Sequence, residues 1–311
     1  MSIASGRNPF WDTIKAVLIC LVVIGHTGTA LNRGLLSVIY AFHMPLFVFV
    51  SGYFSRKKNH KAFWVGIRRL LVIYFVFDIL YLGLDFVLGE TLSVKRLLTP
   101  SFALWYILSL VYWKSLVQFL PNWLFSSRLA RGGIIVLSFV IAIVAGFVPV
   151  DTVMSFQRSC VFLPFFVLGY IARENGMVGW IRRRNGVIMG LLFVLLCVLC
   201  YFYMPVFYAN THYLSGYNDM IMRVVQLCMA IVLCLTVLGI VPDSLGGFTE
   251  LGRWTLLIYL LHPPMIKGAK MLCLRVGIPM TPNTFIAIVI SVLVISLIWL
   301  VRGWKVFKYI S

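Results

Sequence analysis

Long apolar runs recur along the whole chain, separated by short polar segments that carry most of the charged residues. A helix needs about 20 apolar residues to cross a bilayer, and ten runs approach that length. We predict helices at residues 10–31, 35–54, 66–88, 101–120, 132–150, 156–172, 186–205, 220–241, 254–274 and 284–301. The ninth contains the sequence HPPM, whose two prolines should kink or break it. The pattern predicts an all-α integral membrane protein, a bundle of about ten transmembrane helices forming a single domain over residues 1–311.

The composition supports a membrane protein and excludes other classes. Hydrophobic residues make up 61% of the chain and charged residues only 12%, against about 25% charged residues in soluble domains. The net charge of +18 would suit nucleic acid, but the basic residues lie in short loops between apolar runs, so we expect membrane lipid and no nucleic acid as a partner. The seven cysteines also lie in apolar runs, and we expect neither a disulfide framework nor a metal site.

The basic residues also predict the orientation of the chain. With ten helices, both termini lie on the same side of the membrane. Of the 27 basic residues, 24 can be assigned to a side of the membrane. Seventeen of these fall in segments on the side of the termini and seven on the other. Cytoplasmic loops carry the excess of lysine and arginine, so we expect both termini in the cytoplasm.

The first apolar run carries three ionisable residues, Asp12, Lys15 and His26. Such residues in a membrane helix usually face the bundle interior or a wet cavity. Lys15 and His26 are eleven residues apart, which is about three helical turns, so they project from one face roughly 16 Å apart. Asp12 is too far along the helix to orient His26, and we expect it to pair with Lys15 or with an arginine of the third helix.

Other histidines extend this candidate site. His43 lies beside Pro45 in the second helix at a depth similar to that of His26, which predicts a polar internal cavity. Structural hydrogen bonding between helices is the alternative for each buried histidine. His60 is expected to be solvated, His212 to be solvated or part of an acceptor site, and His262 to serve either structure or substrate binding.

Several stretches resemble one family in order along the chain. They are WDTIKAVLICLVVIGH, FHMPLFVFVSGYFSRKK, RRLLVIY, LWYILSLVYWK, FLPFFVLGY and LGRWTLLIYLLH, which together span residues 11 to 262. The chain resembles acyltransferase family 3, the bacterial membrane O-acyltransferases, and within it the fucose 4-O-acetylase-like branch. The family's basic residue and histidine separated by ten residues match Lys15 and His26, so the resemblance implies that His26 is catalytic.

The resemblance implies transfer of acetyl from cytoplasmic acetyl-CoA to a sugar hydroxyl of an envelope or exported glycan or glycolipid, in the bacterial inner membrane. The family often has two arginines separated by two residues at the start of the third helix. Here Arg68 and Arg69 are adjacent, and only Arg69 falls on the usual second position. Because coenzyme A carries phosphates that need multidentate cations, we expect Lys15, Arg68 and Arg69 to bind it.

The expected chemistry assigns the remaining candidates. Acyl transfer to an alcohol needs a base for the hydroxyl proton, and we name His26 and His43 as candidate catalytic residues. Trp105, Tyr106 and His262 are candidates for binding the sugar, although an interfacial aromatic belt also explains the first two. A transporter or flippase of a glycan or lipid-linked intermediate is the alternative function, because intramembrane ionisable residues and broken helices suit transport too.

Overall fold

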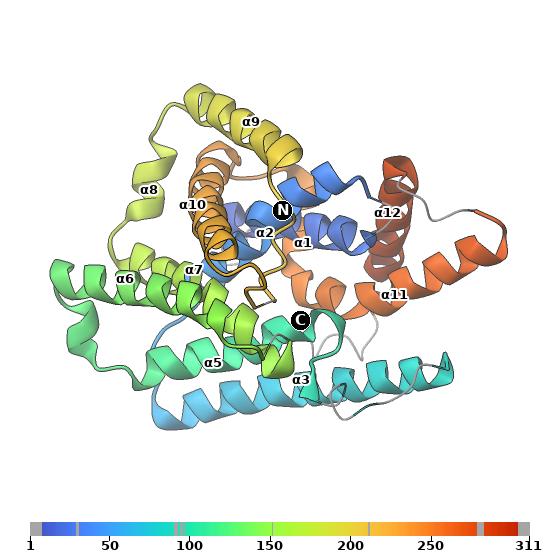
Figure 1. Ribbon diagram of the computed structural model, residues 1–311, viewed down its shortest axis with the longest axis horizontal. Coiled ribbons are helices and arrows are strands. Elements are labelled where there is room, and N and C mark those ends of the chain that lie inside the picture. Colours follow the sequence, from blue (N-terminus) through green and yellow to red (C-terminus); the bar gives the residue numbers. More distant parts are fainter. Residues whose placement is uncertain are drawn as a thin grey trace. The chain divides into compact units, whose positions relative to one another are not determined.

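The computed structural model describes residues 8–28, 31–89, 93, 96, 98–150, 152–210, 212–278 and 283–303. Over these residues the chain folds into helices and turns without a strand. Its α-helices are α1 Pro9–His26, α2 Arg33–Phe54, α3 His60–Val87, α5 Trp105–Phe119, α6 Arg128–Val144, α7 Phe156–Glu174, α8 Met177–Arg182, α9 Gly186–Tyr203, α10 Tyr217–Ile240, α11 Thr255–Arg275 and α12 Thr284–Val301 (Figure 1). The 3-10 helices are η2 Phe102–Leu104, η3 Asn122–Phe125, η4 Ala145–Phe147, η5 Val153–Ser155 and η6 Gly246–Arg253.

Nine helical segments of the described chain are long and apolar enough to cross a membrane. They cover nine of the ten predicted runs. The remaining run, residues 254–274, forms α11, which is not among the nine because prolines and cations interrupt its apolar sequence. The structure supports an all-helical membrane protein, whereas both chain ends, residues 1–7 and 304–311, lie outside the described residues.

Two predicted helix boundaries and one predicted break need correction. The first helix ends at His26, not at residue 31, because the chain turns at Thr27 and enters the left-handed region at Gly28, with φ of 61°. The third helix begins at His60, six residues early, because the side chain of Asn59 caps its N-terminus by accepting from the Ala62 amide. Pro263 and Pro264 do not break α11, which is one continuous helix.

The described chain forms two compact units, each assembled from separate segments. The first unit draws on Met1–Phe47, Ile181–Val206 and Val232–Ser311, and the second on Val48–Trp180 and Phe207–Ile231. Helices α2, α8 and α10 each contribute to both units. The expectation of one transmembrane domain over residues 1–311 stays a prediction.

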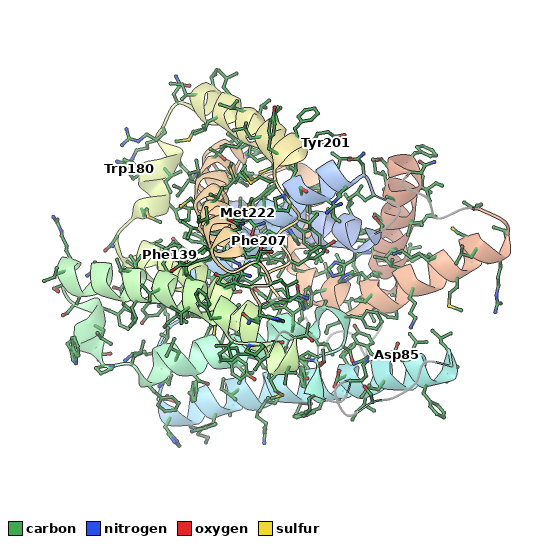
Figure 2. The ribbon with its side chains drawn as sticks, viewed as in Figure 1. Asp85, Phe139, Trp180, Tyr201, Phe207 and Met222 are labelled. Carbon is green, nitrogen blue, oxygen red and sulfur yellow. The ribbon has the colours of Figure 1, made fainter. Side chains whose placement is uncertain are left out.

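In the first unit, α1 is the central element. It packs against η6, α11 and α12, and α11 also packs against α12 (Figure 1). The core side chains of α1 are fully buried; they include Ile14, Leu18, Ile19, Val22 and Val23. At the edge of this unit, Tyr201 near the end of α9 packs on Gly34, where an added Cβ would lie 2.7 Å from the ring (Figure 2).

In the second unit, α3 packs on α5, α5 on α7, and α7 on α6 (Figure 1). Two carboxylates are buried on α3. Asp78 accepts hydrogen bonds from the backbone and hydroxyl of Ser101, and Asp85 forms an ion pair with Arg96 at 2.5 Å (Figure 2). Partners from residues 96–101 thus satisfy both charges, which stabilises the packing of that segment on α3.

Candidate functional site

A cluster of charged side chains lies near the start of α1. Asp12 is only 3% exposed, and its Oδ1 lies 2.6 Å from the Lys15 ammonium. The second carboxylate oxygen, Oδ2, lies 4.0 Å from Nε of Arg253 in η6. The expected pairing of Asp12 with Lys15 is therefore present, and the arginine found beside it comes from η6.

The contact between α1 and η6 holds this cluster in place. Thr13 Oγ1 lies 3.0 Å from Thr249 Oγ1 and also donates to the carbonyl oxygen of Asp243. Gly252 lies so close to α1 that an added Cβ would be 1.9 Å from the Asp12 carbonyl oxygen. Only glycine fits this approach, and Arg253 follows it directly in sequence. The sequence LGRW therefore positions an arginine at the buried carboxylate.

His26 is the last residue of α1 and is partly buried. Its Nδ1 lies 2.8 Å from the carbonyl oxygen of Val22, one turn earlier. A carbonyl oxygen only accepts, so Nδ1 is the donor, and the neutral ring carries its lone pair on Nε2. The sequence predicted His26 deep within a longer helix, whereas the structure places it at the helix end, beside a turn.

His262 lies against His26. The two ring centroids are 4.9 Å apart, with an interplanar angle of 74°. The side chain of His262 is fully buried, and its Nδ1 lies 3.0 Å from the carbonyl oxygen of Ile258. Its Nε2 has no hydrogen-bond partner among the described residues. The sequence named both histidines as candidates, but only the tertiary structure pairs them.

His43 belongs to the same unit and has the same local geometry. Its side chain is 1% exposed, and its Nδ1 lies 2.6 Å from the Ile39 carbonyl oxygen. Its ring also packs edge-on against Tyr40, with centroids 5.0 Å apart. Tyr40 in turn contacts α1 at Gly25. His43 thus lies on the part of α2 that packs near the C-terminal end of α1.

Lys270 is a basic residue at this end of α1 that the sequence interpretation did not single out. A Cβ added at Gly28 would lie 3.4 Å from the Lys270 ammonium nitrogen. Its place in α11, eight residues after His262, puts both side chains near the end of α1. The signal available in the sequence was the helical spacing between these two residues.

The other candidates lie in the second unit. Arg68 and Arg69 are exposed, in the third turn of α3. Trp105 is buried, stacks on Phe162 at 5.5 Å and lies under the guanidinium of Arg158. Tyr106 is buried too, and its hydroxyl lies 2.5 Å from Ser51 Oγ. Their roles in binding coenzyme A or a sugar stay predictions.

His60 is exposed, as expected, and it accepts a hydrogen bond from Trp64 Nε1.

No group of three or more histidine, cysteine, aspartate or glutamate side chains within the described part of the chain could hold a metal ion. The candidate site described above contains three imidazoles, the Lys15–Asp12 pair, the Arg253 guanidinium and backbone carbonyls.

Comparison with known families decides what this arrangement belongs to. A family model described as an acyltransferase domain matches residues 8–301. The chain belongs to acyltransferase family 3. Members of this family transfer acyl groups, so the chain is an acyltransferase and the transporter interpretation is set aside. No curated protein and no solved structure matches the chain in the same comparisons.

Proposed function

We propose that this acyltransferase is a membrane O-acetyltransferase of the fucose 4-O-acetylase-like branch. It moves acetyl from cytoplasmic acetyl-CoA to a sugar hydroxyl of an envelope or exported glycan or glycolipid, in the inner membrane of a bacterium. The observation that carries the proposal is the 2.8 Å distance between His26 Nδ1 and the Val22 carbonyl oxygen. Because Nδ1 donates to the Val22 carbonyl, the neutral ring presents Nε2 as a proton acceptor.

The proposed reaction uses Nε2 of His26 as the base. As the sugar oxygen attacks the thioester carbonyl, Nε2 of His26 takes the hydroxyl proton. The tetrahedral intermediate then collapses, the carbon–sulfur bond breaks, and the imidazolium returns its proton to the departing thiolate. The hydrogen bond from Nδ1 to Val22 persists throughout and holds the ring in one orientation. A base positioned in this way contributes about 10²–10⁴-fold to the rate.

The neighbouring residues have supporting roles in this proposal. His262 and His43 line the region around His26. Nε2 of His262, which has no hydrogen-bond partner among the described residues, offers an acceptor for a second sugar hydroxyl. We assign Lys15, Arg68 and Arg69 to the phosphates of the acyl donor. Trp105 and Tyr106 of the second unit stay proposed sugar-binding residues.

The test is acetyl transfer from radiolabelled acetyl-CoA in membranes that contain the protein. We expect the wild type to label a glycan fraction. The transfer rate of His26→Ala should be about 10²–10⁴-fold lower, while this variant still inserts and binds acetyl-CoA. His60→Ala is the matched control, because it removes an exposed histidine that lies outside the site. Near-normal transfer by a folded His26→Ala protein would show that another group is the base.

A further inference from the structure

Near their C-terminal ends, α2 and α7 cross with an unusually close approach of their backbones. A Cβ added at Gly52 would lie 2.0 Å from the Phe166 carbonyl oxygen, and one added at Gly169 would lie 2.0 Å from that of Phe49. Each glycine therefore lets the other helix's backbone approach. The crossing brings the C-terminal ends of the two helices side by side within the second unit.

A basic cleft lies between these ends, with a volume of about 380 Å³. We define it by its lining residues, Ser55, Arg56, Lys57, Tyr170, Arg173 and Glu174. Three cations face one carboxylate, so the cleft carries an excess of positive charge. The helix dipole favours cations near helix C-termini. It explains why each cation is present, but it does not explain why all three line the same cleft.

Two of the cations are held in place by protein contacts. Arg173 donates to the Tyr53 carbonyl oxygen at 3.3 Å and lies over the ring of the same residue. Lys57 donates to the Leu120 carbonyl oxygen at the end of α5. The next residue, Lys58, exchanges two hydrogen bonds with the Gln118 side chain, so the segment after α2 is anchored on α5.

Arg56 differs from its neighbours. It is exposed, lines the cleft and makes no hydrogen bond or ion pair with any described residue. Its guanidinium is therefore available for a ligand, beside two cations whose positions are fixed. Guanidinium groups bind phosphate oxygens through paired hydrogen bonds, and several cations together favour a multiply charged or bidentate anion.

The cleft lies where membrane-crossing helices end, which is the level of lipid headgroups. Large apolar side chains near it are exposed: Phe54 is 51% exposed and Trp123, in η3 directly after α5, is 65% exposed. Tryptophan is enriched at the membrane–water interface. Basic pockets between transmembrane helices at this level bind the headgroups of anionic phospholipids.

We propose that the basic cleft binds the phosphate headgroup of an anionic phospholipid. Arg56, Arg173 and Lys57 hold the phosphate oxygens, while the acyl chains lie against the exposed apolar faces of the helices that end here. This site does not depend on which acyl donor or acceptor the enzyme uses.

Native mass spectrometry tests the proposal on the purified full-length protein titrated with cardiolipin or phosphatidylglycerol, with phosphatidylcholine, a zwitterionic lipid of zero net charge, as the reference. We expect Arg56→Gln and Arg173→Gln each to raise the half-saturating concentration of the anionic lipid about fivefold, the worth of one basic side chain at an anionic surface. Arg128→Gln is the matched control, because it removes an exposed arginine at the start of α6, outside the cleft. Binding of phosphatidylcholine should not change.

The same experiment separates lipid from a soluble phosphate ester. Coenzyme A added at saturating concentration should leave the bound anionic lipid in place; displacement of the lipid would instead assign the cleft to the acyl donor and overturn the proposal. Unchanged lipid retention in both cleft variants, or an equal loss in Arg128→Gln, would overturn it as well. Loss of acetyl transfer in His26→Ala concerns only the proposed function and leaves this outcome untouched.

Discussion

At the residue scale, His26, His43 and His262 share one local arrangement. In each ring, Nδ1 lies within hydrogen-bond distance of the carbonyl oxygen four residues earlier. A helix offers this carbonyl acceptor to any histidine with a suitable rotamer. A histidine's place within a helix therefore favours the tautomer that is protonated on Nδ1. The rings then present Nε2 as the acceptor, which suits a base or a hydroxyl-binding group.

We expect His262→Asn to raise the KM for the acceptor about three- to tenfold, in line with the loss of one hydrogen bond. The asparagine amide can replace Nδ1 as donor to Ile258, but it cannot replace the buried Nε2. Initial rates at varied acceptor concentration measure the effect, and donor binding should stay unchanged. An unaltered acceptor KM would assign His262 to packing alone.

Arg69→Ala should weaken acetyl-CoA binding by about 1.5–3 kcal/mol, the range for hydrogen bonds to charged groups. Lysine at this position should restore only part of the affinity, because it lacks the planar fork of arginine. Equilibrium binding of labelled acetyl-CoA to the purified protein is the measurement. Wild-type affinity in folded Arg69→Ala would remove this arginine from the donor site.

At the scale of elements, glycine decides how closely helices meet. Gly52 and Gly169 permit the crossing of α2 and α7, and Gly252 permits the contact of η6 with α1. In a membrane, small residues at helix contacts allow backbone approach and van der Waals packing, because lipid supplies no hydrophobic force between helices. These glycines therefore have a structural role that composition alone would not reveal.

Gly52→Ala should destabilise the protein by about 1–3 kcal/mol, the cost of overpacking a tight contact. The matched control is Gly66→Ala in α3, where an added Cβ meets no atom within 4 Å. That change should be neutral or slightly stabilising, because alanine favours the helix. Thermal unfolding in detergent compares the two variants, and equal stability would contradict the close crossing.

At the scale of the whole molecule, the distribution of basic residues predicts one orientation. With both termini in the cytoplasm, a fluorescent protein fused after Ser311 should fluoresce and an alkaline phosphatase fusion at the same point should be inactive. The reverse pattern would place Asp12 and Lys15 on the outer side and would exclude access of acetyl-CoA to them from the cytoplasm.

The helices, the family and the best candidate for the base followed from sequence, because each rests on local information. Apolar runs of membrane-spanning length predict helices wherever they occur, and the spacing of Lys15 and His26 on one helix carries the resemblance. The expected pairing of Asp12 with Lys15 is confirmed for the same reason, because Lys15 is one turn away. Arg253, the second cation beside Asp12, comes from a distant segment and was not predicted.

Only the tertiary structure could pair His26 with His262 or bring Arg56 and Arg173 to one cleft. Hydropathy says that a helix crosses the membrane, but lipid is equally apolar on every side, so it does not say which helices touch. Those neighbours are selected by packing at a few small residues and by buried polar groups that must find partners. The same limit applies to the end of α1. The predicted helix continued to residue 31, whereas the chain turns after His26, with a positive φ at Gly28.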